Sequence, residues 1–80
     1  MNKDEAKNAI GESLATVLGT EVDGWEENTN LIDEGYLDSL DSMRFLFELD
    51  KKVGKKVVED HEVELESFQV SFLLNRISGE

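Results

Sequence analysis

Apolar residues recur every three or four positions near the amino terminus, which is the spacing of one face of an α-helix. The recurring residues are Ala6, Ile10, Leu14, Val17 and Leu18. Asn2 precedes them as a capping residue, Glu5 can reach back to the Asn2 backbone, and Gly19 is a typical helix stop. We therefore predict a first helix between Asn2 and Gly19.

A second helical pattern runs from Ser39 to Val53 and ends before Gly54, because glycine favours the left-handed conformation found at helix ends. Its predicted apolar stripe consists of Leu40, Met43, Leu46, Phe47 and Val53, widened by Phe45 and Leu49. So wide an apolar surface predicts a central helix that its neighbours contact on several sides.

The segment between these helices, residues 19–38, is rich in Gly, Asn, Thr and acidic residues, which indicates a long loop. Apolar residues spaced through it are expected to pin the loop onto the helices: Val22, Trp25, Leu31, Ile32 and Tyr36. Residues 57–65 alternate apolar and acidic positions and are predicted to form a short, irregular helix.

The last helix is predicted to start at Ser67 as its cap, with Arg76 near its carboxyl end, where the helix dipole favours a cation. Its apolar residues are Phe68, Val70, Phe72, Leu73, Leu74 and Ile77. The whole pattern, without proline or internal repeats, predicts an all-α fold. We expect a small four-helix bundle of three long helices and one short irregular helix, forming a single domain over residues 1–80.

The net charge of the chain restricts the kinds of molecule that it is expected to bind. The chain has 19 acidic and 8 basic residues, which gives a formal charge of −11. Nucleic acids and anionic membranes are bound through Lys and Arg, so neither is an expected partner. Basic protein surfaces fit the flanks better, although residues 39–58 hold five cations against three acids, a formal sum of +2.

Several site classes are excluded by residue content. The chain has no cysteine, so disulfides, thiolate nucleophiles and cysteine metal sites are impossible. The amphipathic, charged amino terminus does not resemble a signal peptide, and no apolar run reaches membrane length, so we expect a cytoplasmic protein without direct membrane insertion. His61 is the single histidine and the acidic runs lack calcium-loop spacing, so neither a metal site nor catalytic residues are expected.

Ser39 is the residue with two competing interpretations. Asp and Ser are preferred at helix starts, where their oxygens accept free backbone N–H groups, so the pair Asp38–Ser39 could be only a cap. In the functional interpretation Asp38 caps and the Ser39 hydroxyl stays exposed. A phosphodiester built on that hydroxyl would lie beside the positive end of the helix dipole.

The run "NTNLIDEGYLDSLDSMRFLFELDKKVGKKV", from Asn28 to Val57, resembles the acyl carrier protein family, whose signature is Asp-Ser-Leu at the start of the second helix. The resemblance extends more weakly over the whole chain, including the run "ESFQV" at the start of the last helix. It implies that Ser39 bears a covalent 4′-phosphopantetheine from coenzyme A, with Asp38 and Leu40 as adjoining recognition residues.

By the same resemblance, the thiol of this arm holds an acyl or aminoacyl group as a thioester for delivery to partner enzymes. The chain itself is then a non-catalytic, monomeric carrier, and its partners are a phosphopantetheinyl transferase, a loading ligase and acyltransferases. The implied docking face consists of Asp41, Met43, Arg44 and Glu48. The implied acyl pocket consists of Met43, Leu46, Phe47, Val57, Leu65 and Phe68.

Cationic residues in the second helix separate this chain from carriers of general fatty-acid synthesis, in which that helix is nearly all acidic. Arg44, Lys51 and Lys52 stand among the acids here, and charge complementarity sets partner choice. A specialised carrier is therefore expected, with short, polar or outward-lying cargo if phenylalanine fills the pocket. The alternative is an acidic helical adaptor that binds a partner peptide without any prosthetic group.

Overall fold

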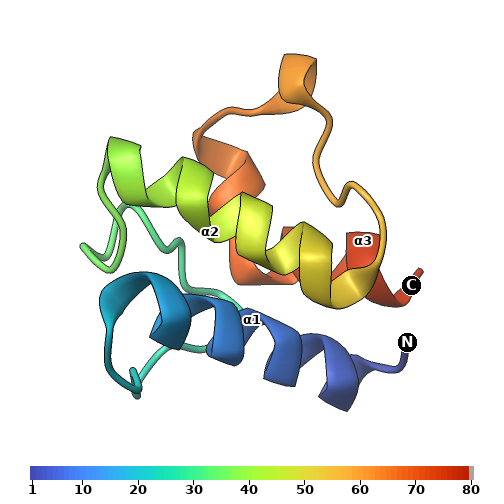
Figure 1. Cartoon of the computed structure of the whole chain (residues 1–80), viewed down its shortest axis with the longest axis horizontal. Helices are drawn as coiled ribbons and strands as arrows, with labels where there is room; N and C mark the ends of the chain where they lie inside the picture. The colour runs from blue at the N-terminus through green and yellow to red at the C-terminus, as the bar shows by residue number, and fades with distance from the viewer. Residues whose placement is uncertain (80) are drawn as a thin grey trace.

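The computed structural model describes residues 1–79 and contains three α-helices. They are α1 (Lys3–Leu18), α2 (Ser39–Val53) and α3 (Val70–Ser78), with two short 3₁₀ turns, η1 (Asp60–Glu62) and η2 (Leu65–Phe68), before α3. As Figure 1 shows, α1 lies along α2, and α3 packs against α1. The prediction of an all-helical fold is confirmed for the described residues, which contain no strand longer than a single bridge.

The ends of the first two helices are fixed by the residues that the sequence indicated. Asn2 accepts the Glu5 N–H at 2.8 Å, and the Glu5 carboxylate accepts the Asn2 N–H at 3.0 Å. Gly19 and Gly54 end α1 and α2 with φ angles of 78° and 86°, a backbone region that side chains with a Cβ disfavour. The predicted bounds of both helices are confirmed.

The predicted start of the last helix is wrong. Ser67 lies inside η2, where its buried hydroxyl accepts the Glu64 N–H at 3.2 Å and donates to the Glu62 carbonyl at 3.0 Å. It therefore closes a 3₁₀ turn instead of capping an α-helix. Gln69 has extended backbone angles, φ −70° and ψ 127°, and α3 begins only at Val70.

The predicted fourth helix over residues 57–65 is not confirmed, because that stretch contains only the three-residue turn η1 and the start of η2. Val57 and Val58 are buried in the core, and the Val57 N–H donates to the Asp50 side chain at 2.9 Å. These contacts hold the chain after α2 against the core, and η1 projects from the bundle at the top of Figure 1.

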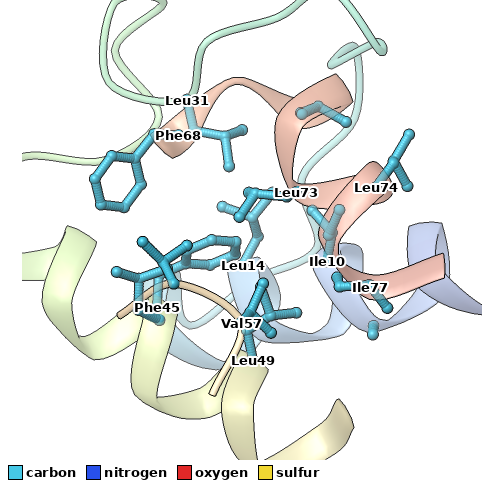
Figure 2. Close-up of a cluster of buried hydrophobic side chains, with 14 of the residues drawn as sticks. Ile10, Leu14, Leu31, Phe45, Leu49, Val57, Phe68, Leu73, Leu74 and Ile77 are labelled. Atoms are coloured by element: carbon cyan, nitrogen blue, oxygen red, sulfur yellow. The ribbon is translucent and has the colours of Figure 1, made fainter. Parts of the chain in front are cut away.

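The core is built from all three helices and from the segments that connect them. Figure 2 shows side chains of α1, α2 and α3 converging with Leu31 and Val57. Its members are Ala6, Ala9, Ile10, Leu14, Val17, Leu31, Leu37, Phe45, Leu46, Leu49, Val57, Val58, Phe68, Val70, Leu73, Leu74 and Ile77. The largest fully buried side chains are Phe45 and Phe68.

The apolar residues predicted for α2 are divided between two sides of the helix, and the partly buried Val53 packs against the core together with the buried ones. The buried residues of this helix are Ser42, Phe45, Leu46 and Leu49. Leu40, Met43 and Phe47, by contrast, are 73%, 51% and 62% exposed. Since α2 is apolar around most of its circumference, periodicity alone could not show which side faces α1.

The long loop, residues 19–38, is held in place as expected by apolar contacts and also by hydrogen bonds that the sequence did not indicate. Leu31 is buried, and Trp25, Ile32 and Tyr36 pack partly buried against the core. The Leu31 N–H donates to the Phe68 carbonyl and the Val70 N–H donates to the Thr29 carbonyl, both at 2.9 Å. The loop is therefore paired with the entry to α3.

Asn30 joins the two paired segments through its side chain. Its Oδ1 accepts the N–H groups of Ile32 and Asp33 at 3.0 and 3.1 Å, and its Nδ2 donates to the Leu65 carbonyl at 2.9 Å. Because Asn30 is buried, these groups have little access to water if the amide is removed. We expect Asn30→Ala to lower the free energy of unfolding by about 2–3 kcal/mol.

Urea denaturation followed by circular dichroism measures this loss. Asn28→Ala is the matched control, because Asn28 is exposed and contributes its backbone carbonyl, which accepts from Gln69 Nε2 at 2.9 Å and survives the substitution. Equal losses for the two variants would show that the Asn30 side chain does not fix the loop.

Candidate functional site

Ser39 is the first residue of α2, and its side chain is exposed. The helix start is capped by the residue before it. Asp38 Oδ1 accepts the Asp41 N–H at 2.7 Å, and the Asp38 carbonyl accepts the Ser42 N–H at 2.9 Å. The structure thus gives Asp38 the capping role, and the cap does not use the Ser39 hydroxyl.

Two buried residues fix the backbone on either side of Ser39. Leu37 is buried, and its N–H donates to the Leu31 carbonyl at 2.9 Å. Ser42 is buried one turn later, and its Oγ donates to the Ser39 carbonyl at 2.8 Å. Ser39 and Leu40 are therefore presented to solvent by a turn whose two ends are anchored in the core.

Sequence reasoning missed both anchors. Leu37 precedes the capping Asp38, and hydrophobic residues in that position often pack against the first turns of a helix. Ser42 lies three and seven residues before Phe45 and Leu49, so it shares their buried face. If Phe45 is placed in the core, this spacing predicts that Ser42 is buried as well.

The predicted docking residues lie together on the outward side of α2. Arg44 pairs with Asp41 at 3.3 Å, and Lys51 pairs with Glu48 at 3.1 Å, each pair three residues apart on the helix. Met43 stands exposed beside these pairs. Lys51 Nζ also lies 5.0 Å from the centre of the Phe47 ring.

The six residues of the predicted acyl pocket are separated in the structure. Val57 and Phe68 are buried core residues, and Leu65 borders a hollow with Asn30, Glu66 and Phe72. Met43, Leu46 and Phe47 border a different hollow of about 250 Å³, between α2 and the segment that follows it. The other residues around this second hollow are Asp50, Lys56, Val58 and Asp60.

Charged contacts hold the segment beside this hollow. The Arg76 guanidinium makes a bidentate ion pair with Glu62, one nitrogen at 3.1 Å from Oε1, and it also donates to the Val57 carbonyl at 3.2 Å. Arg76 further stacks 4.8 Å from the centre of the Phe72 ring. Hydrogen bonds from Arg76 and from the Glu59 backbone lower the pKa of Glu62 to about 2.

The lowered pKa predicts a pH-dependent contribution to stability. A carboxylate with a depressed pKa in the folded state stabilises the fold above its ordinary pKa of 4.5 and loses that contribution as the pH falls toward the folded value. We expect the difference in unfolding free energy between the parent and Glu62→Gln to be constant above about pH 5, to shrink below it and to vanish near pH 2.

Urea titrations at several pH values measure that difference. Glu34→Gln, which changes an exposed turn residue, is the control for the general effect of removing one negative charge. If the difference in unfolding free energy between the parent and Glu62→Gln stayed constant down to pH 2, the lowered pKa of Glu62 would be contradicted.

His61 is exposed. Within residues 1–79, no three His, Asp or Glu side chains converge as metal ligands would. None of the helices in the described part of the chain has both the length and the apolar character that crossing a bilayer requires.

The comparisons with known proteins bear on the exposed Ser39 turn. The family model described as "Phosphopantetheine attachment site" matches residues 8–69, a range that includes most of α1, the long loop, all of α2 and the turn before α3. No curated protein and no solved structure matches the chain significantly. Because the matched range covers more than half of the chain, this protein belongs to the phosphopantetheine attachment site family, whose domains bear a covalently bound 4′-phosphopantetheine.

Proposed function

We propose that Ser39 is the attachment residue for 4′-phosphopantetheine and that residues 1–80 act as one carrier domain. The observation that supports this best is the division of roles at the start of α2: Asp38 accepts the Asp41 N–H, which leaves the neighbouring exposed hydroxyl for chemistry. When bound, the group supplies a flexible arm whose thiol can hold an acyl or aminoacyl unit as a thioester.

The residues around Ser39 fit such a group. Ser39 and Leu40 are both exposed, so a transferase can reach the hydroxyl from solvent. The free N–H end of α2 favours negative charge in its first turn, where the phosphodiester would lie. The anchors at Leu37 and Ser42 keep this turn in one conformation, so the hydroxyl does not have to be ordered when the enzyme binds.

The outward side of α2 is the proposed docking face for partner enzymes. It combines the predicted docking residues Asp41, Met43, Arg44 and Glu48 with Leu40 next to the attachment residue. Carrier domains in general meet phosphopantetheinyl transferases and biosynthetic enzymes. For this chain we propose a transferase, a loading ligase and acyltransferases as the classes of partner.

Incubation of the purified chain with coenzyme A, magnesium ion and a broad-specificity phosphopantetheinyl transferase tests the proposal. Intact mass spectrometry is expected to show the addition of a single arm, and fragmentation of the modified peptide is expected to place it on Ser39. If several such transferases add nothing, the proposal is wrong, and the peptide-binding adaptor becomes the better explanation of the exposed apolar side chains on α2.

The interior of the fold supports short or outward-lying cargo. The core side chains Phe45, Leu49, Val57 and Phe68 are buried and occupy the interior. The hollow outside them, about 250 Å³ in volume, has Lys56 and Asp60 at its border, joined by an ion pair of 2.9 Å. This volume is below the range of about 300–1,000 Å³ that is usual for small-molecule pockets.

A chain-length series of acyl groups on the arm should therefore add no stability beyond the first few carbons. An acyl chain that enters a core raises the free energy of unfolding by about 0.8 kcal/mol for each methylene buried, and the melting temperature rises with it. We expect a rise over at most the first few carbons, followed by a plateau, in thermal melts of the acylated protein. A steady rise through long chains would show that the core opens to admit cargo. The matched reference is the unacylated arm-bearing protein.

A further inference from the structure

Residues 55–64 connect the end of α2 to η2, and we call them the connecting segment. Figure 1 shows the segment leaving α2, rising to η1 and returning to η2. Its regular structure is limited to the three-residue turn η1, whereas α2 beside it is a helix of 15 residues. The connecting segment is therefore the part of this side of the molecule that moves with the smallest loss of backbone hydrogen bonds.

Val58 is the residue of the connecting segment that separates the core from the solvent. It is 2% exposed and belongs to the core, and it also borders the hollow of about 250 Å³ between α2 and the segment. Leu46 is the other buried residue at the border of this hollow. Because Leu46 is fixed within α2, an acyl chain that enters the core from the hollow has to displace Val58.

Arg76 of α3 fastens the connecting segment near both of its ends. Near the start, Arg76 Nη1 donates to the Val57 carbonyl at 3.2 Å, and Lys55 Nζ donates to the Arg76 carbonyl at 3.0 Å. Near the end, the guanidinium makes its bidentate ion pair with Glu62. One planar guanidinium thus joins two points of the segment to the last turn of α3.

The surroundings of the Arg76–Glu62 pair strengthen it. The two side chains are 37% and 30% exposed, and the guanidinium carbon lies 4.8 Å from the centre of the Phe72 ring. Partial burial reduces screening by salt, and two parallel hydrogen bonds make this pair stronger than one with a single contact. The pair between Lys56 and Asp60, by contrast, lies within the segment and joins it to no helix. Arg76 is therefore the charged residue that resists movement of the segment.

We propose that Arg76 is a positioning residue that holds Val58 in place and thereby limits the length of the acyl group that the carrier encloses. This inference rests on the proposed function, because it concerns cargo on the Ser39 arm, and it adds the residue that sets the class of cargo. With Arg76 in place, short groups occupy the outer hollow and longer groups extend into solvent. Without Arg76, the segment moves together with Val58, and the core admits further methylenes.

Melting temperatures of the protein bearing a series of acyl groups, from acetyl to dodecanoyl, test the proposal. Each acylated protein is compared with the same variant bearing the unacylated arm. The parent is expected to reach its plateau within the first few carbons, whereas the melting temperature of Arg76→Gln is expected to rise through at least the octanoyl group. A residue that only stabilised the fold would lower every melting temperature of the series equally and would leave the plateau at the same chain length.

Two variants provide matched controls for the chain-length series. Lys56→Gln removes a cation and an ion pair from the same segment, but that pair joins the segment to no helix. Ala15→Gly changes a partly buried position within α1 and is expected to lower the stability of the whole fold, because glycine is unfavourable inside a helix. Both control variants are expected to keep the plateau of the parent.

Hydrogen exchange of the chain without the arm gives a second measurement. The Val57 N–H donates to the Asp50 side chain and the Glu62 N–H donates to the Glu59 carbonyl, both at 2.9 Å. These two amides therefore report movement of the connecting segment. Arg76→Gln is expected to raise their exchange rates by about tenfold or more, and the two control variants are expected to change them by less than about threefold.

Glu62→Gln keeps the proposal testable if Arg76→Gln does not fold. This variant removes the ion pair but leaves the hydrogen bond from Arg76 to the Val57 carbonyl. It is therefore expected to lengthen the rising part of the chain-length series and to raise both exchange rates, each by less than Arg76→Gln does.

The possible outcomes separate this inference from the proposed function. A plateau for Arg76→Gln at the chain length of the parent, or a longer plateau that Ala15→Gly shares, overturns the role of Arg76 and leaves Ser39 as the attachment residue. A parent whose melting temperature rises steadily through long chains also overturns it, since the segment then does not limit entry. If no transferase modifies Ser39, the proposed function is wrong, and the inference about cargo falls with it whatever the exchange rates show.

Discussion

The Ser39→Ala variant is expected to fold as the parent does and to gain no mass when it is incubated with coenzyme A and a phosphopantetheinyl transferase. The parent should be converted completely under the same conditions. The physical reason is that the attached group needs an oxygen in solvent at the first turn of α2, and the substitution removes that oxygen alone. Because the cap is made by Asp38, and because the Ser39 hydroxyl takes no part in it, stability should change by no more than about 0.5 kcal/mol.

Ser42→Ala is the matched control on the same helix. Ser42 is buried, and its hydroxyl donates to the Ser39 carbonyl at 2.8 Å, so its removal should cost about 1 kcal/mol of stability and leave the attachment oxygen in place. Intact mass and a thermal melt measure both quantities for each variant. Complete modification of Ser39→Ala, or loss of modification confined to Ser42→Ala, would move the attachment residue away from Ser39.

The starts and ends of α1 and α2 could be predicted because short-range interactions decide them. The Asn2 cap, the Asp38 cap and the glycines at 19 and 54 each act within four residues of the position that they define. The same local logic identified Asp38 as a capping residue, but it left open whether Ser39 belonged to the cap or stayed exposed. The structure decides this point, because Asp38 accepts the Asp41 N–H and Ser39 is exposed.

The region after α2 was not predictable in the same way, because contacts distant in sequence determine it. Asn30 donates to Leu65, thirty-five residues away, and Arg76 pairs with Glu62 across fourteen residues. These contacts select 3₁₀ turns where the local pattern indicated a helix. Ser67 adds a shorter link between the two turns, since its hydroxyl donates to the Glu62 carbonyl five residues earlier.

The acyl pocket could not be located from the sequence, because helix periodicity does not show which side of a helix is buried. Residues were assigned to one pocket from a family resemblance, but their side chains point to three places: the core for Phe68 and Val57, one hollow for Leu65, and another for Met43 and Phe47. Helix periodicity gives a set of faces without saying which face meets a neighbour. That choice depends on where α1 packs, and α1 packs on the side of Phe45.

Phe45 and Phe47 therefore provide the sharpest test of the packing of α2. Phe45 has no exposed surface and Phe47 is 62% exposed, although both lie in the same helix and differ by only two positions. Phe45→Ala removes a side chain from the centre of the core and should lower the free energy of unfolding by about 3–5 kcal/mol. That loss approaches the whole stability expected of so small a domain, roughly 5 kcal/mol, so much of the variant should be unfolded at body temperature.

Phe47→Ala should cost less than about 1 kcal/mol, because the side chain buries little area in the isolated chain and its contact with Lys51 lies at the surface. Urea denaturation at 25 °C, followed by far-ultraviolet circular dichroism, compares the two variants directly. If the order were reversed, with Phe47 the more costly residue, then α2 would be rotated so that Leu40, Met43 and Phe47 face the core. In that arrangement the docking face proposed on the outward side of α2 would not be available, so this pair of variants also tests the geometry on which the proposed function depends.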